Sequence, residues 1–139
     1  MFDTILVGTD GSAPANKAVV HALEQAELTG ATLHAIFVVD TERFSEPALS
    51  SIELITQDIE EWGAAELAEV AERAEDLGLD VVTHCCHGKP WHEIVSYADE
   101  VDADLIVLGY QGEEHIDPGH IGSVADRVVR NAGRPVLIA

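Results

Sequence analysis

This sequence of 139 residues has little positive charge: 26 Asp and Glu stand against 7 Lys and Arg, a formal net charge of −19 with neutral histidines. Binding to nucleic acid or to an anionic membrane surface depends on clustered cationic side chains. We therefore expect no nucleic acid and no membrane as a partner. The acidic residues are spread along the sequence, which also argues against an acidic interaction tail.

The same charge excess suggests the solvent in which the protein works. Self-repulsion of this size is screened at an ionic strength of about 1 M, where the Debye length falls to roughly 3 Å. We therefore expect a halophilic protein from a salt-rich cytoplasm. An ordinary acidic protein is the alternative.

Long hydrophobic runs are also missing, because the longest apolar stretches have strand length and the roughly 18 residues that span a membrane are never reached. The sequence enters a strand-like segment near its start with no charged region or cleavage site before it. These features predict a cytoplasmic protein. With 139 residues we expect a single domain, 1–139, with one sizeable core.

Cysteine is rare, and the two cysteines, Cys85 and Cys86, are adjacent. Neighbours on a strand point to opposite faces, so they do not form a C-x-x-C redox pair. His84, His87 and His92 lie nearby and raise zinc binding as a hypothesis. Alternation leaves at most two ligands on one face, whereas tetrahedral zinc takes three or four. We expect reduced, structural cysteines and no metal site.

Apolar segments with the periods of strands and helices alternate along the sequence. Strands are predicted at 4–8, 32–39, 80–87, 105–109 and 135–139. Helices are predicted at 12–30, 51–77, 90–101 and 122–131; in the second, Trp62 and Leu77 should face inward, and Gly63 allows a bend. Near-continuous apolar strands indicate a parallel sheet covered on both faces. The predicted fold class is α/β: one doubly wound, Rossmann-like sheet of five parallel strands, with order 3-2-1-4-5.

In a sheet of this order, ligands bind outside the carboxyl ends of the first and fourth strands, where the winding reverses. Thr9 and Asp10 follow the first strand, and Gly109 follows the fourth, so two unusual loops should meet at one crevice. Asp10 has two interpretations: a carboxylate for a divalent cation or ribose hydroxyl, or a turn residue that accepts backbone N–H groups. Val38 either offers its backbone to an adenine edge or belongs to the core.

The segment from Gly109 to Ser123 reads GYQGEEHIDPGHIGS. Two residues separate its first two glycines, and nine more precede Gly122 and Ser123, which open a helix. A strand, a loop and a helix N-terminus in this order present backbone N–H groups and a positive dipole end at one point, an arrangement that binds phosphate. A purely structural loop is the alternative.

This spacing resembles the nucleotide-binding loop of the ATP-binding branch of the universal stress protein family, with its pattern G-x2-G-x9-G-[ST]. The resemblance extends from ILVGTDGS at 5–12, through GKP at 88–90 and GSVADRV at 122–128, to PVLI at 135–138. It implies a dimeric stress-response regulator that binds ATP or a related adenine nucleotide with Mg²⁺ or Mn²⁺. It also implies a protein partner, which the sequence does not identify.

The resemblance implies roles for individual residues. Thr9 and Asp10 would lie near ribose and phosphate, and Val38 would contact adenine through its backbone. The remaining cofactor-binding residues would be Gly109 and Gly112 near ribose and triphosphate, Gln111 as a hydrogen-bond donor, and Gly122, Ser123 and Val124 as phosphate donors. Family dimers often form through the last strand, which makes Val136 and Ile138 candidates for the interface.

Glu113 and Glu114 stand where the family often has a basic or polar residue, and Asp117 follows in the same loop. A dimeric interaction module of the same fold that binds no nucleotide is therefore the alternative function. An enzyme that transfers phosphoryl or adenylyl groups is a third hypothesis. Against it, G-x4-G-K-[ST] is absent, and no Lys or Arg lies between Lys89 and Arg127. We expect no catalytic residues, and no activity beyond slow ATP hydrolysis.

Overall fold

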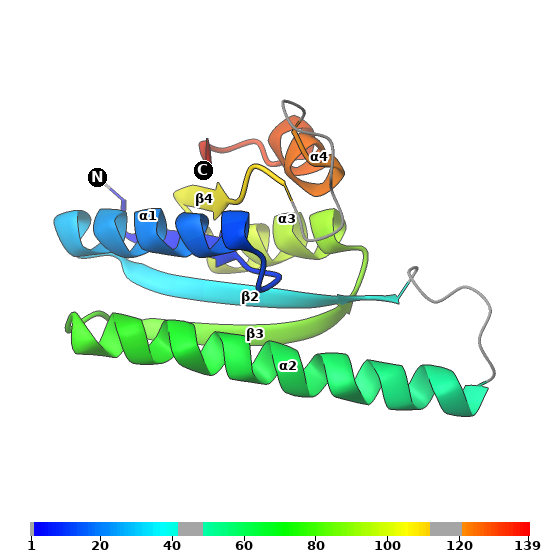
Figure 1. The fold of residues 1–139 in the computed structure, drawn as a ribbon. Helices are drawn as coiled ribbons and strands as arrows, with labels where there is room; N and C mark the ends of the chain where they lie inside the picture. The colour runs from blue at the N-terminus through cyan, green and yellow to red at the C-terminus, as the bar shows by residue number, and fades with distance from the viewer. Residues whose placement is uncertain (1, 42–48, 112–120) are drawn as a thin grey trace.

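The computed structural model describes residues 2–41, 49–111 and 121–139, and of residues 49–56 only the backbone. Strands and helices alternate throughout (Figure 1). The strands are β1 (Thr4–Gly8), β2 (Thr32–Asp40), β3 (Val81–Gly88), β4 (Leu105–Leu108) and β5 (Val136–Ile138). The helices are α1 (Ala13–Thr29), α2 (Leu49–Asp76), α3 (Pro90–Val101) and α4 (Ser123–Asn131).

The strands form one sheet of five in the order β3-β2-β1-β4-β5. All neighbouring strands are parallel; Ile5 of β1, for example, pairs with Leu33 on one side and Leu105 on the other. This confirms the predicted fold class and strand order. The connections lead outward on both sides of β1 and β4, so the winding reverses between these two central strands.

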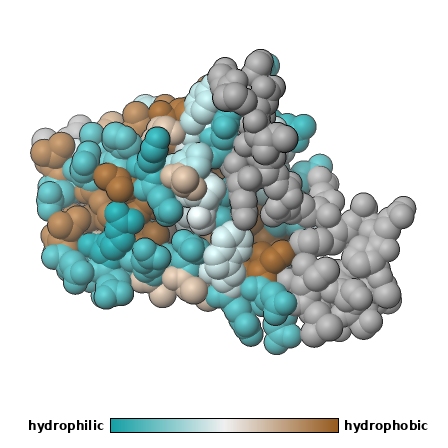
Figure 2. All heavy atoms as spheres, viewed as in Figure 1, coloured by the Kyte–Doolittle hydropathy of each residue, from teal (hydrophilic) through white to brown (hydrophobic). Residues whose placement is uncertain are grey.

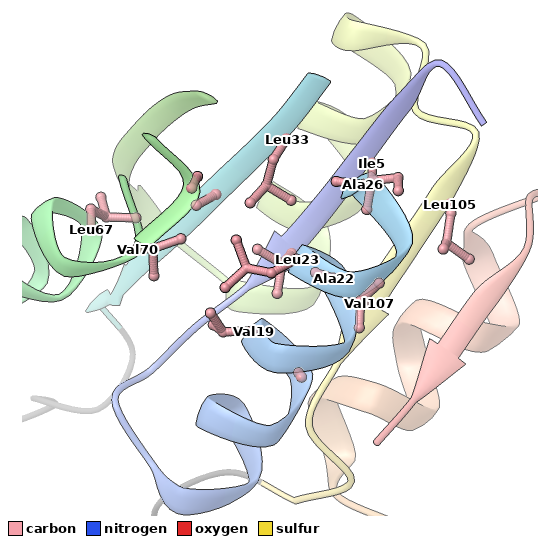
Figure 3. Close-up of a cluster of buried hydrophobic side chains, with 14 of the residues drawn as sticks. Ile5, Val19, Ala22, Leu23, Ala26, Leu33, Leu67, Val70, Leu105 and Val107 are labelled. Atoms are coloured by element: carbon pink, nitrogen blue, oxygen red, sulfur yellow. The ribbon is translucent and has the colours of Figure 1, made fainter. Parts of the chain in front are cut away.

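Helices α1 and α2 cover one face of the sheet, and α3 and α4 cover the other. On the first face, small alanines of α1 allow the helix to lie close to β1 and β4, and α2 packs over β2 and β3 (Figures 1 and 3). The predicted inward stripe of α1 is buried throughout: Ala15, Ala18, Val19, Ala22, Leu23 and Ala26. On the second face, Leu6, Ile36 and Ile106 of the sheet meet Ile94 and Tyr97 of α3 and Val128 of α4.

Two side chains of the predicted second helix, 51–77, differ from expectation. Trp62 is 38% exposed and Leu77 is 45% exposed, so neither is an inward core residue. Gly63 lies within the uninterrupted helix, where a Cβ would come within 2.5 Å of the ring of Phe37 on β2. The glycine therefore gives room for close packing between the helix and the sheet.

The described surface in Figure 2 is mostly hydrophilic, with hydrophobic residues scattered between the polar ones. Isolated exposed apolar side chains are normal on a folded protein. Within the described ranges, no helix combines the length and the apolar character needed to cross a membrane.

Candidate functional site: a cleft at the carboxyl ends of the strands

A cleft of about 320 Å³ opens at the carboxyl ends of β1, β2 and β4. It occupies the point where the winding reverses, as the strand order predicts. All the predicted cofactor-binding residues within the described part of the chain line it: Thr9, Asp10, Val38, Gly109, Gln111, Gly122, Ser123 and Val124. Gly112 lies outside the described residues, as do Glu113, Glu114 and Asp117.

The turn after β1 forms one side of this cleft. The Thr9 side chain is buried, and its hydroxyl oxygen accepts a hydrogen bond from the Gly11 N–H at 3.3 Å. Asp10 accepts a hydrogen bond from the Ser12 N–H at 2.9 Å, and Ser12 in turn caps α1 by accepting from the Ala15 N–H. The turn interpretation of Asp10 is thus confirmed. Its carboxylate also lines the cleft, so contact with a ligand stays a prediction.

Gly109 brings β4 against the beginning of α1. A Cβ at this position would lie 2.7 Å from the carbonyl carbon of Pro14 and 2.8 Å from the nitrogen of Ala15. Because these are backbone atoms, no change of rotamer could relieve the contact. Packing against α1 therefore requires glycine here, which the sequence pattern alone did not indicate.

The N-terminus of α4 forms the opposite side. Gly122 is buried, and its N–H donates to the Tyr110 carbonyl at 2.8 Å. The first hydrogen bond of the helix runs from the Asp126 N–H to the Gly122 carbonyl, so the amides of Ser123, Val124 and Ala125 precede the helical ladder. All three residues line the cleft. Donors and a positive dipole end at this place suit an anion.

Sequence reasoning missed the apolar walls of the cleft and one carboxylate. Trp62 of α2 lies against the β1–α1 turn, where a Cβ on Gly11 would come within 2.6 Å of its ring, and it packs edge-on to Phe37 at 5.7 Å between ring centroids. Ile59, Pro90 and Ile94 add apolar surface, and Asp40 ends β2 beside them. The sequence did contain a signal for this apolar wall: a tryptophan on the helix that follows β2, in a sequence with few aromatic residues.

A smaller side cleft of about 100 Å³ adjoins the main one. The two share Asp40, Pro90, Ser123 and Val124. The side cleft is otherwise lined by Lys89, Trp91 and Arg127. No Lys or Arg lies between Lys89 and Arg127 in the sequence, and this gap was an argument against an enzyme. In the folded chain both residues line the side cleft.

Neither cleft is lined by the cysteines or their histidine neighbours. Burial, followed by the charges of Glu93 and Cys85, raises the pKa of Cys86 to about 11, and burial with the Glu60 charge raises the pKa of Cys85. The thiolate that binds zinc is therefore disfavoured at neutral pH. Among the residues that the structure describes, no three His, Cys, Asp or Glu gather as a metal site.

Comparison with known proteins places this chain in a family. The profile of the Universal stress protein family matches residues 1–139. The chain is 39% identical over 139 residues to Universal stress protein MJ0531 of Methanocaldococcus jannaschii, covering 99% of this chain and 82% of the relative. Among solved structures, that of MJ0577 superposes with a TM-score of 0.85 at 25% identity, covering 100% of this chain and 96% of that one. A universal stress protein in complex with cAMP superposes with a TM-score of 0.74 at 30% identity, covering 99% and 97%. This chain therefore belongs to the universal stress protein family.

Proposed function

We propose that this protein is a stress-response regulator that binds an adenine nucleotide, ATP first among them, in the main cleft. The observation that carries the proposal is the N-terminus of α4, whose first three residues line a cleft at the reversal point of the sheet and precede the first helical hydrogen bond. Phosphate binds well at such a helix end. The walls formed by Trp62, Ile59 and Ile94 suit the faces of a nucleobase.

The related structure with cAMP supports an adenine nucleotide as the ligand, since that protein shares the fold over nearly its whole length. In this chain, Val38 lies where β2 reaches the cleft, and its backbone is our candidate for contact with adenine. The phosphates would then lie toward Ser123. This arrangement uses backbone groups for both ends of the ligand.

The oxygen ligands in the cleft would hold a divalent cation only when the phosphates of the nucleotide complete its coordination. Asp10, Asp40 and the hydroxyl of Ser123 line the cleft and are oxygen ligands of the kind Mg²⁺ and Mn²⁺ prefer. Mg²⁺ is commonly held by one or two carboxylates together with substrate phosphates. When bound, the cation would neutralise phosphate charge beside these carboxylates.

The direct test is calorimetric titration with Mg-ATP at low salt and in molar KCl. The net charge of −19 repels a phosphate ligand, and from their place in the sequence we expect Glu113 and Glu114 to add to this repulsion. Screening should therefore raise ATP affinity in molar KCl, opposite to the behaviour of a basic site, and should also raise the melting temperature.

The double variant Glu113→Gln, Glu114→Gln is titrated under the same conditions and should bind ATP more tightly than the parent at low salt. Affinity that falls with salt in the parent, or no gain in the variant, would contradict the role given to the acidic loop. If neither protein binds ATP at either salt concentration, the alternative stands: a dimeric interaction module of the same fold that binds no nucleotide.

We further propose that the protein is a homodimer that pairs through β5. This strand is the outer strand beside β4, and Val136 and Ile138 are only partly buried. An uncharged strand at a sheet edge is prone to pairing with another copy. Light scattering in molar KCl should give a dimer at micromolar concentration, and deletion of the last four residues should leave a monomer or an unfolded chain. A monomeric intact protein under these conditions would rule out this interface.

A further inference from the structure

The side cleft collects hydrogen-bond donors and positive charge in a strongly acidic protein. Lys89 and Arg127 line it, although the whole chain has only 7 Lys and Arg. Asp40 is the acidic residue among its lining, so the local formal charge is positive where the overall charge is −19. Such a place attracts an anion against the field of the rest of the molecule.

Trp91 adds a further donor. Its indole Nε1 is buried from solvent and makes no hydrogen bond with any residue that the structure describes. An indole N–H can only donate, and a buried donor left unsatisfied costs about 1 to 3 kcal/mol. Trp91 lines the side cleft, and its ring would have to turn to bring this N–H to an acceptor bound there.

Two helices also begin at this cleft. Helix α3 starts at Pro90 after Lys89, and α4 starts at Ser123 after Gly122; neither of these N-cap residues has a side chain that accepts a hydrogen bond from the helix N–H groups. Lys89 and Asp40 each already interact within the protein, so an incoming anion would share or exchange those contacts. The two helix dipoles and two side-chain cations converge beside Ser123.

Size and position define what the side cleft can hold. Its volume of about 100 Å³, against about 320 Å³ for the main cleft, suits a small anionic group better than a nucleobase. It continues directly from the main cleft at Ser123 and Val124, where the first phosphate is placed by the proposed function.

We infer that the side cleft binds the distal phosphoryl groups of a nucleotide whose base lies in the main cleft, so that the protein selects nucleoside di- and triphosphates over monophosphates. Lys89 and Arg127 are the residues that determine this selectivity, and the Trp91 N–H supports it. The inference rests on the proposed function, since the nucleotide must first bind in the main cleft.

The experiment compares Mg-ATP, AMP and inorganic tripolyphosphate by calorimetric titration. The parent should bind ATP more tightly than AMP or tripolyphosphate. Lys89→Gln and Arg127→Gln should each lower ATP affinity about tenfold, about 1.4 kcal/mol, and change AMP affinity less than twofold. Trp91→Phe, which keeps a ring but removes the N–H, should lower ATP affinity about threefold and leave AMP unchanged.

Arg130→Gln is the matched control. It removes the same charge from the same helix, but Arg130 is exposed, pairs with Asp126 at 3.1 Å and lines neither cleft. It should change the affinity for ATP less than twofold. Unchanged AMP binding by the Lys89 and Arg127 variants shows that they are folded.

The outcomes separate this inference from the proposed function. If the parent binds neither ATP nor AMP, the proposed function fails. If ATP and AMP bind equally well, if Lys89→Gln weakens both to the same degree, or if Arg130→Gln acts as strongly as Lys89→Gln, the side cleft is not a phosphate site. Tripolyphosphate that binds as tightly as ATP would show a free anion site and would also overturn the inference.

Discussion

Replacing Gly122 with valine should lower ATP affinity about a hundredfold, which corresponds to about 2.8 kcal/mol. Gly122 lines the cleft immediately before the α4 amides that we assign to the phosphates. Its φ of −64° and ψ of 154° are open to any residue, so valine brings no backbone strain. The added side chain would instead occupy space that the phosphates need to approach the backbone.

Calorimetry in molar KCl would measure this loss, and the melting temperature would show whether the variant is folded. Ser123→Ala is the companion variant. It removes one hydroxyl and keeps every backbone N–H, so its ATP affinity should fall far less, about fivefold for one lost hydrogen bond. A folded Gly122→Val protein that binds ATP like the parent would contradict the assignment of the phosphates to α4.

Replacing Gly109 with alanine should lower the free energy of unfolding by about 3 kcal/mol. The added methyl would meet Pro14 and Ala15 backbone atoms at 2.7 to 2.9 Å, so α1 would have to move away from β4. Helix α1 packs on both β1 and β4. Its displacement would therefore also disturb the hydrophobic core on the sheet face that α1 and α2 cover.

Gly30→Ala is the control for a purely conformational cost. Gly30 has a φ of 73° with no atom within 4 Å of a Cβ, so alanine there should cost only about 1 kcal/mol. Urea unfolding at fixed molar KCl would compare the two variants. A cost at Gly109 no larger than that at Gly30 would show that the close approach of β4 to α1 does not constrain this position.

The fold could be predicted because its signals are local. The apolar stripe of α1, with Ser12 and Gly30 as its caps, appears in the sequence at the spacing that the structure buries. Alternation of such helices with short apolar strands indicated a parallel sheet, and the predicted strand order placed the loops after β1 and β4 at one crevice. In the structure, a cleft lies at this point and is lined by the residues that follow β1 and β4.

The packing between distant elements could not be predicted in the same way. Trp62 has the spacing of an inward residue, but in the structure it is partly exposed, packs edge-on to Phe37 and lines the cleft. Lys89 and Arg127 are far apart in the sequence and meet only because α3 and α4 start side by side at the carboxyl edge. Periodicity within one element contains no information about either contact.

The measurement that tests the central claim most directly is an amide NMR titration of the isotope-labelled protein with Mg-ATP in molar KCl. We predict that the amide signals of Thr9, Val38, Ser123 and Val124 shift or broaden together. Gly30 and Gly78, in the turns after α1 and α2 at the opposite edge of the sheet, should stay unchanged. No shifts at saturating ATP, or shifts gathered at that opposite edge, would contradict nucleotide binding in the cleft.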